Sequence, residues 1–134
     1  MILKSLLTIP VLLILFAGGV WADWEFIGKS DAGSSFYIDY DSIEKKEGHI
    51  YFWYLMDQPE ANLAGYKSIK SYEKIDCKDS RRKALEAVFY KHPMGQEPGD
   101  SKTPPGKFKE WQNIPLGTAI AAVFKRVCNF EDIS

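Results

Sequence analysis

The sequence predicts an α+β domain, an antiparallel β-sheet of about five to six strands with a C-terminal α-helix packed on one face. Short runs of β-branched and aromatic residues, separated by turn residues, fill most of the chain after residue 23. Helical spacing of apolar residues begins only after Pro115. The two cysteines, Cys77 and Cys128, end a predicted strand and the predicted helix, so a disulfide between them would tether the helix to the sheet.

Each expected strand is a run of β-forming residues. The runs are residues 24–28, 35–39, 49–56, 66–77 and 84–90, with a short one around Trp111. The run HIYFWYLM at 49–56 is apolar on both faces, which predicts a central strand. Turns are expected at 31–34, at Glu47-Gly48 and at 78–83. Residues 92–106 are rich in Pro and Gly, which predicts a long loop without regular structure.

The last segment predicts an amphipathic helix. Its apolar residues recur at helical spacing: Ile120, Val123, Phe124, Val127 and Cys128. Thr118 precedes them as an N-cap, and Lys125 and Arg126 lie near the C-terminal end, where the helix dipole favours positive charge.

The stretch FYIDYDSIEKKEGH carries two closely spaced carboxylates, Asp39 and Asp41. A calcium loop starting at Asp39 would need Asp or Asn, then Gly, where Ile43 and Glu44 stand, and Glu where Ile50 stands. We therefore expect neither a metal site nor a catalytic site here. Asp39 is expected to close a strand, and Asp41 to cap one helical turn with Glu44 at the capping-box position.

The N-terminus has the layout of a secretory signal peptide. Lys4 precedes an uncharged apolar stretch, and Val20-Trp21-Ala22 resembles a cleavage site, which gives a signal peptide at 1–22 and a domain at 23–134. Export to the periplasm or beyond is the expected localisation, and no second apolar run is long enough to span a bilayer. In an oxidising compartment, Cys77 and Cys128 favour a disulfide worth about 4 kcal/mol by chain entropy.

The sequence offers no catalytic constellation. No nucleophile motif is present, the serine of Ser71-Tyr72-Glu73-Lys74 falls in a predicted strand, and His49 and His92 lack zinc-like spacing. Without residues 1–22 the chain carries 16 basic and 18 acidic side chains, a balance that does not favour nucleic acid. We expect no enzyme, no metal and no cofactor.

Two features are candidates for binding a protein partner. Positive charge concentrates around one turn, at Lys78, Arg81, Arg82 and Lys83. Tyr51, Trp53 and Leu55 form one side of the central strand. They are core if they face the helix, and a partner surface if they face away from it; the sequence leaves both possibilities open.

The order of several short motifs resembles the surface-adhesin protein E family of Gram-negative bacteria. After the signal peptide the motifs are W-x-x-x-G-x-S from Trp24, Y-I-D-x-D-S-I at 37–43, Y-x-S-x-K from Tyr66, D-C at 76–77, W-x-x-I-P at 111–115 and V-C at 127–128. The resemblance implies the same fold, with Cys77 and Cys128 as its disulfide.

The resemblance also implies a non-enzymatic binding role. The namesake of the family is a surface lipoprotein that binds host extracellular-matrix proteins and haem. This sequence lacks the cysteine that would accept a lipid, which favours the periplasm or secretion, with the cell surface as an alternative. The implied partners are extracellular-matrix or envelope proteins. Haem is a weaker alternative, for which His92 is the candidate side chain.

Overall fold

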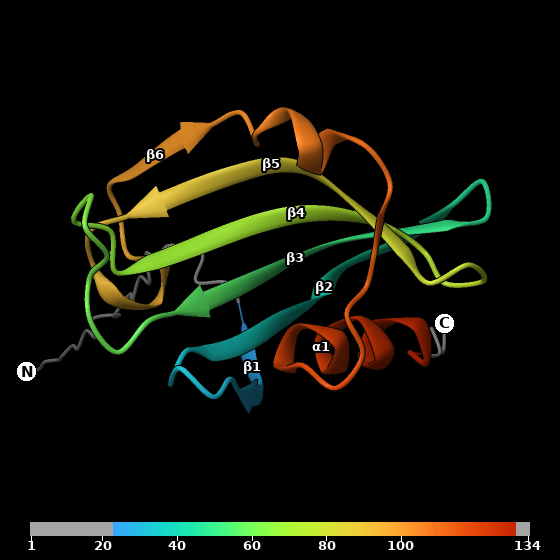
Figure 1. Cartoon of the computed structure of the whole chain (residues 1–134), viewed down its shortest axis with the longest axis horizontal. Helices are drawn as coiled ribbons and strands as arrows, with labels where there is room; N and C mark the ends of the chain where they lie inside the picture. The colour runs from blue at the N-terminus through green and yellow to red at the C-terminus, as the bar shows by residue number, and fades with distance from the viewer. Residues whose placement is uncertain (1–22, 131–134) are drawn as a thin grey trace, which may run out of the picture.

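Seven strands and one helix make up the computed structural model, which describes residues 23–130. The elements are β1 (Trp24–Lys29), β2 (Ser35–Lys46), β3 (His49–Asp57), β4 (Ser68–Asp76), β5 (Arg81–Tyr90), β6 (Gly99–Lys102), β7 (Gln112–Asn113) and α1 (Ala119–Cys128), with 3₁₀ turns η1 (Pro93–Gly95) and η2 (Gly106–Lys109). The strands form one curled antiparallel sheet in the order β1 to β6 (Figure 1). The short strand β7 pairs with the first two residues of β5, Arg81 and Arg82. The predicted fold class is confirmed.

Tight turns explain why neighbouring strands are also consecutive in the chain. Lys46 pairs with His49 across the two-residue turn Glu47-Gly48, and both turn residues have positive φ, 50° and 80°. Turns of this kind match the twist of the flanking strands, and glycine tolerates the conformation best. The predicted turn at this position is confirmed.

The main core lies between α1 and one face of the sheet. Phe36, Ile38, Phe52 and Ile75 point from β2, β3 and β4 towards the helix. Phe124 of α1 meets Phe52 edge-on, with ring centroids 6.0 Å apart. Because residues on a strand alternate between faces, Tyr51 and Trp53 lie on the face opposite to α1.

The helix follows its predicted boundaries. Thr118 is the N-cap, and its hydroxyl accepts a hydrogen bond from the Ala121 N–H at 3.2 Å. Val123, Phe124 and Val127 are its buried residues. The predicted disulfide is present, with 5.8 Å between the Cα atoms of Cys77 and Cys128, and it joins the C-terminal end of α1 to the residue after β4.

The prediction of a strand end at Asp39 and a capped helical turn at Asp41 is wrong. Strand β2 continues to Lys46 with a bulge between Asp39 and Glu44. The Ser42 hydroxyl spans the bulge, since it donates to the Asp39 carbonyl at 2.6 Å and accepts from the Trp53 N–H at 2.9 Å. The bulge places both Tyr40 and Ile43 against the core, a spacing of three residues that resembles helical periodicity.

The prediction that residues 92–106 lack regular structure is also wrong. They contain η1 and β6, and Gly99 pairs with Tyr90 of β5. A Cβ atom on Gly99 would lie 2.4 Å from Cε1 of Tyr90 and 2.7 Å from Cγ1 of Val88. Gly99, one of the residues on which the loop prediction rested, is therefore required because β6 approaches β5 closely at this position.

The predicted signal peptide, residues 1–22, and the last four residues of the predicted domain lie outside the described part of the chain. Between residues 23 and 130, no helix is long and apolar enough to cross a membrane.

Candidate binding site

The face of the sheet opposite to α1, here called the outer face, carries a strip of half-buried aromatic side chains. Tyr51 and Trp53 of β3 and Tyr72 of β4 form this aromatic strip. The rings of Trp53 and Tyr72 lie directly opposite each other in register, with centroids 5.0 Å apart, and those of Tyr51 and Tyr72 are 6.2 Å apart. A half-exposed aromatic strip on an uncovered sheet face is a common feature of protein-binding surfaces.

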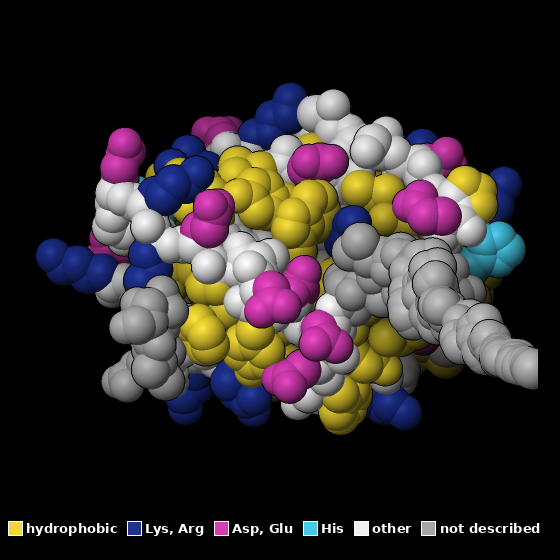
Figure 2. All heavy atoms as spheres, turned by 180° about the vertical axis from the view of Figure 1, so that it is seen from behind, with side chains coloured by type: hydrophobic (Ala, Val, Ile, Leu, Met, Phe, Trp, Pro, Cys, Tyr) yellow, Lys and Arg dark blue, Asp and Glu magenta, His cyan; other side chains and the backbone are white. Residues whose placement is uncertain are grey.

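Lysine side chains lie over this strip. The ammonium of Lys70 is 4.7 Å from the centroid of the Trp53 ring, and that of Lys46 is 4.6 Å from the centroid of Tyr51. The aliphatic stems cover apolar ring surface while the charges stay in water. Figure 2 shows this side of the molecule: hydrophobic side chains are visible over much of it, Lys and Arg gather towards one end, and Asp and Glu lie across the middle.

Positively charged side chains surround Trp111 and are here called the basic cluster. The charged groups of Lys74, Arg81 and Lys83 lie 5.6, 4.7 and 4.8 Å from the centroid of its indole ring. The His49 ring is 5.3 Å from it. Lys46 completes the cluster, because it shares the Tyr51 ring with Lys74.

Arg81 is the member of the basic cluster with a carboxylate partner. Its Nη2 donates to Asp76 at 2.8 Å and lies 3.7 Å from Asp79. The hydrogen bond from Arg81, with a second from the Asp79 N–H, holds the pKa of the Asp76 carboxyl below its usual range. Within residues 23–130, Lys46, Lys74 and Lys83 form no salt bridge.

Arg82, a predicted partner-contact residue, points to the face that α1 covers. Its guanidinium makes two hydrogen bonds to the fully buried Glu73, at 2.9 and 3.0 Å, and lies 5.1 Å from the Phe124 ring centroid. Burial alone would lower the pKa of Arg82, but the hydrogen bonds to Glu73 raise it. The Ser71 hydroxyl also donates to Glu73, at 2.5 Å. This side chain stabilises the interior and is not presented on the outer face.

One cavity, of about 290 Å³, is lined by residues 43–46 of β2 and by Phe130. Two others open on the α1 side of the sheet. One, of about 350 Å³, lies between the β3–β5 surface beyond α1 and the segment 102–108, and Tyr54, Arg82 and Phe108 are among its lining residues. Burial, together with the charge of Glu73, raises the pKa of Tyr54, so its hydroxyl stays neutral. The other, of about 610 Å³, runs beside the disulfide and is lined by Ile114, Leu116 and one side of α1.

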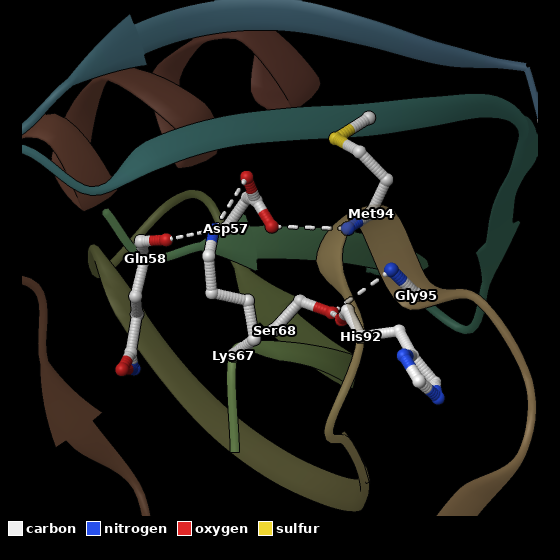
Figure 3. A network of polar contacts seen from close by, with 7 residues as sticks. All are labelled: Asp57, Gln58, Lys67, Ser68, His92, Met94 and Gly95. Carbon is white, nitrogen blue, oxygen red and sulfur yellow. Dashed lines mark hydrogen bonds and ion pairs between the residues drawn. The ribbon is translucent and has the colours of Figure 1, made fainter. Parts of the chain in front are cut away.

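His92 belongs to a polar network that holds η1 onto the sheet (Figure 3). The Ser68 hydroxyl donates to the His92 carbonyl at 2.7 Å and accepts from the Gly95 N–H at 2.9 Å. Asp57 accepts from the Met94 N–H at 3.0 Å and pairs with Lys67 at 3.6 Å.

In Figure 3 the His92 imidazole points away from this network. The side chain is exposed, and His92 lines neither cavity on the α1 side. In the part of the chain that the structure describes, no three His, Cys, Asp or Glu side chains group as metal ligands. The haem hypothesis therefore stays a prediction from the sequence.

Of the seven candidate contact residues, the structure places Tyr51, Trp53, Arg81 and Lys83 on the outer face. Leu55 is fully buried next to Gly95 of η1 and so is neither under α1 nor available to a partner. The predicted turn at 78–83 is too long, because β5 begins at Arg81 and only Lys78 of the four basic candidates lies in the turn.

Sequence reasoning missed Tyr72 of the aromatic strip and Lys46, Lys74 and Trp111 of the basic cluster. Strand alternation indicated Lys74, which lies opposite Tyr51 in β4. Trp111 lies in an irregular segment ahead of β7, and no periodicity in the sequence places such a residue on a face.

Comparison with known proteins gives a consistent answer. A family model described as surface-adhesin protein E matches residues 24–129. The solved structures of Haemophilus influenzae protein E are similar to this chain. Its crystal form II has a TM-score of 0.59 at 16% identity and covers 89% of this chain and 96% of that one. A second structure has a TM-score of 0.55 at 17% identity, with coverages of 82% and 86%.

A third structure, of protein E from non-typeable Haemophilus influenzae, has a TM-score of 0.51 at 17% identity, with coverages of 89% and 84%. At these identities the structures support the fold. Comparison with curated protein sequences gave no match. The family model spans both cysteines, the aromatic strip and α1. The chain belongs to the surface-adhesin protein E family.

Proposed function

We propose that this protein is an exported, non-enzymatic binding protein that recognises a protein partner at the cell envelope through the aromatic strip of its outer face. Membership of the adhesin family supports a binding role. The observation that carries the proposal is the position of Tyr51, Trp53 and Tyr72, which are half-buried on the sheet face that α1 leaves uncovered.

The composition of the strip fits a protein partner. Large, rigid aromatic side chains contribute much contact area at a low cost in conformational entropy, and Trp, Tyr and Arg dominate binding energies at interfaces. The strip offers one Trp and two Tyr on neighbouring strands, held in place by backbone pairing. Extracellular-matrix and envelope proteins are the proposed partners.

Binding of the purified protein to immobilised extracellular-matrix proteins tests the proposal. Trp53→Ala is expected to weaken binding by roughly tenfold or more, because truncation of a central aromatic anchor typically costs over 1 kcal/mol. Leu63→Ala is the matched control, since Leu63 is fully exposed (relative exposure 108%) in the loop between β3 and β4, away from the strip.

Equal binding by wild type and Trp53→Ala would exclude the strip as the partner site. Loss of binding in both variants would point to a global effect of substitution. Thermal unfolding of each variant, followed by circular dichroism, separates a lost contact from a lost fold.

A further inference from the structure

We propose that the basic cluster at one end of the outer face is a binding site for a sulfated polysaccharide. The inference goes beyond the protein partner proposed above, because it concerns a different ligand chemistry and, apart from Tyr51, different residues. The observations that carry it are a like-charge pair, the absence of salt bridges to three lysines within the described residues, and the row in which the charges lie.

Lys74 and Lys83 lie directly opposite each other in the β4–β5 register. Like charges in this position destabilise a sheet. Both ammonium groups are within 6 Å of the Trp111 ring centroid, so the ring attracts them but also brings them together. An anion bound over the pair relieves this repulsion. Anion binding therefore accounts for an arrangement that would only destabilise a surface exposed to water alone.

The carboxylates near these charges are not paired with the lysines. Glu44, which lies opposite Tyr51 in β2, forms no salt bridge within the described residues. Asp76 and Asp79 are both occupied by Arg81. Lys46, Lys74 and Lys83 have no salt-bridge partner between residues 23 and 130.

The geometry favours an extended anion. Lys46, Lys74 and Lys83 come from β2, β4 and β5, and adjacent strands lie about 4.8 Å apart, so the row crosses the sheet over roughly 15 Å. The free charges are lysines, which act as adaptable point charges, whereas the single arginine fork is already paired with carboxylates. A linear chain that bears sulfate groups at close intervals matches such a row.

An acidic protein segment fits the cluster less well. Pockets for side chains give peptide recognition its specificity, and acidic motifs are typically recognised by arginine clusters. The one arginine of this cluster, Arg81, already pairs with Asp76 and Asp79. The cavity of about 290 Å³ reaches the cluster only at Lys46, and those of about 350 and 610 Å³ lie on the α1 side, so Lys74, Lys83 and Trp111 line none of the three. The cluster therefore recognises charge density rather than side-chain shape.

The test measures binding of the protein, purified from expression of the full chain, to a size-fractionated heparin octasaccharide at several salt concentrations. Lys74→Ala/Lys83→Ala is expected to weaken binding about tenfold or more. It should also reduce the slope of log affinity against log salt by about two, because each lysine that is removed no longer displaces a counterion from the polysaccharide. The control Lys109→Ala/Lys125→Ala removes the same charge from two exposed lysines outside the cluster, at the end of η2 and in α1, and should leave binding nearly unchanged.

Three further results would overturn the proposal: no binding of the octasaccharide, equal loss in both double variants, or equal binding of a chemically desulfated octasaccharide. Poly-L-glutamate binding as tightly as heparin would favour an acidic protein segment, and binding only to phosphatidylglycerol vesicles would favour a membrane surface. Trp53→Ala separates the two proposals, because it should impair matrix-protein binding and spare heparin. A heparin-induced rise in melting temperature, smaller in Lys74→Ala/Lys83→Ala, confirms that the cluster variant is folded and reports on the same site.

Discussion

Single residues of one strand take opposite roles according to the face on which they lie. Arg81 and Arg82 are neighbours in β5, yet Arg81 stacks on Trp111 at the outer face, whereas Arg82 pairs with Glu73 on the face that α1 covers. Glu73 is fully buried, and the Arg82 side chain is 15% exposed. The same alternation separates Trp53 of the aromatic strip from Phe52 of the core.

The buried pair yields a prediction about stability. Arg82→Ala leaves the Glu73 carboxylate buried without its cation, and we expect a loss of about 3–5 kcal/mol in the free energy of unfolding, measured by urea denaturation. Glu73→Leu/Arg82→Leu removes both charges and should recover most of the loss. If the free energy of unfolding of Arg82→Ala lies within about 1 kcal/mol of the wild-type value, Glu73 is not held as a buried charge.

At the scale of elements, irregular features determine which residues reach the functional face. The bulge in β2 changes the alternation between Asp39 and Glu44, so that Lys46 meets Tyr51 on the outer face. Asp39, on β2 opposite Trp53, is partly buried there, and this burial raises the pKa of its carboxyl. Segment 102–108 covers part of the other face and leads to Trp111, so that a length of chain with little regular structure completes the basic cluster.

The attachment of α1 yields a prediction at the same scale. The helix has ten residues, too few to be stable alone in water, so its packing and the Cys77–Cys128 bond hold it. Cys128→Ser should lower the melting temperature by at least several degrees, since the bond closes a long loop worth about 4 kcal/mol. Wild-type protein under reductant should have the same melting temperature as the variant. A wild-type melting curve that reductant leaves unchanged would contradict the disulfide.

At the scale of the whole molecule, one face of the sheet contributes to the core and the other carries the candidate binding residues. One face buries the core under α1 and segment 102–108, and the other presents the aromatic strip and the basic cluster, with η1 fixed over its end by Ser68 and Asp57. The part of this face that η1 leaves open presents side chains of paired strands to a partner, which fits an adhesin-like binding role.

The proposed export yields a prediction for the intact cell. Fractionation of the native host should recover the protein in the envelope or the medium, without residues 1–22. Protease added to whole cells should degrade it if it is displayed on the surface and spare it if it is periplasmic, whereas permeabilised cells should lose it in both cases. Recovery of the uncleaved chain in the cytoplasm would contradict export.

Much of the fold could be predicted because it depends on local signals. The Glu47-Gly48 turn, the Thr118 cap and the helical spacing up to Cys128 each act within a few residues, and the structure confirms all three. The errors at Asp41 and at residues 92–106 arose where a long-range contact overrides local preference. Ser42 bonds across to Trp53, and Gly99 packs against Tyr90.

The sequence by itself determined the class of fold, the pairing of Cys77 with Cys128 and the family, because periodicity, turn chemistry and the order of motifs are properties of the chain. Only the tertiary structure decided which face of β3 is free, that Arg82 is internal, and that Trp111 gathers Lys74, Arg81 and Lys83. The physical reason is that a one-residue shift in a strand exchanges its two faces. The register, the bulges and the position of α1 decide that shift together.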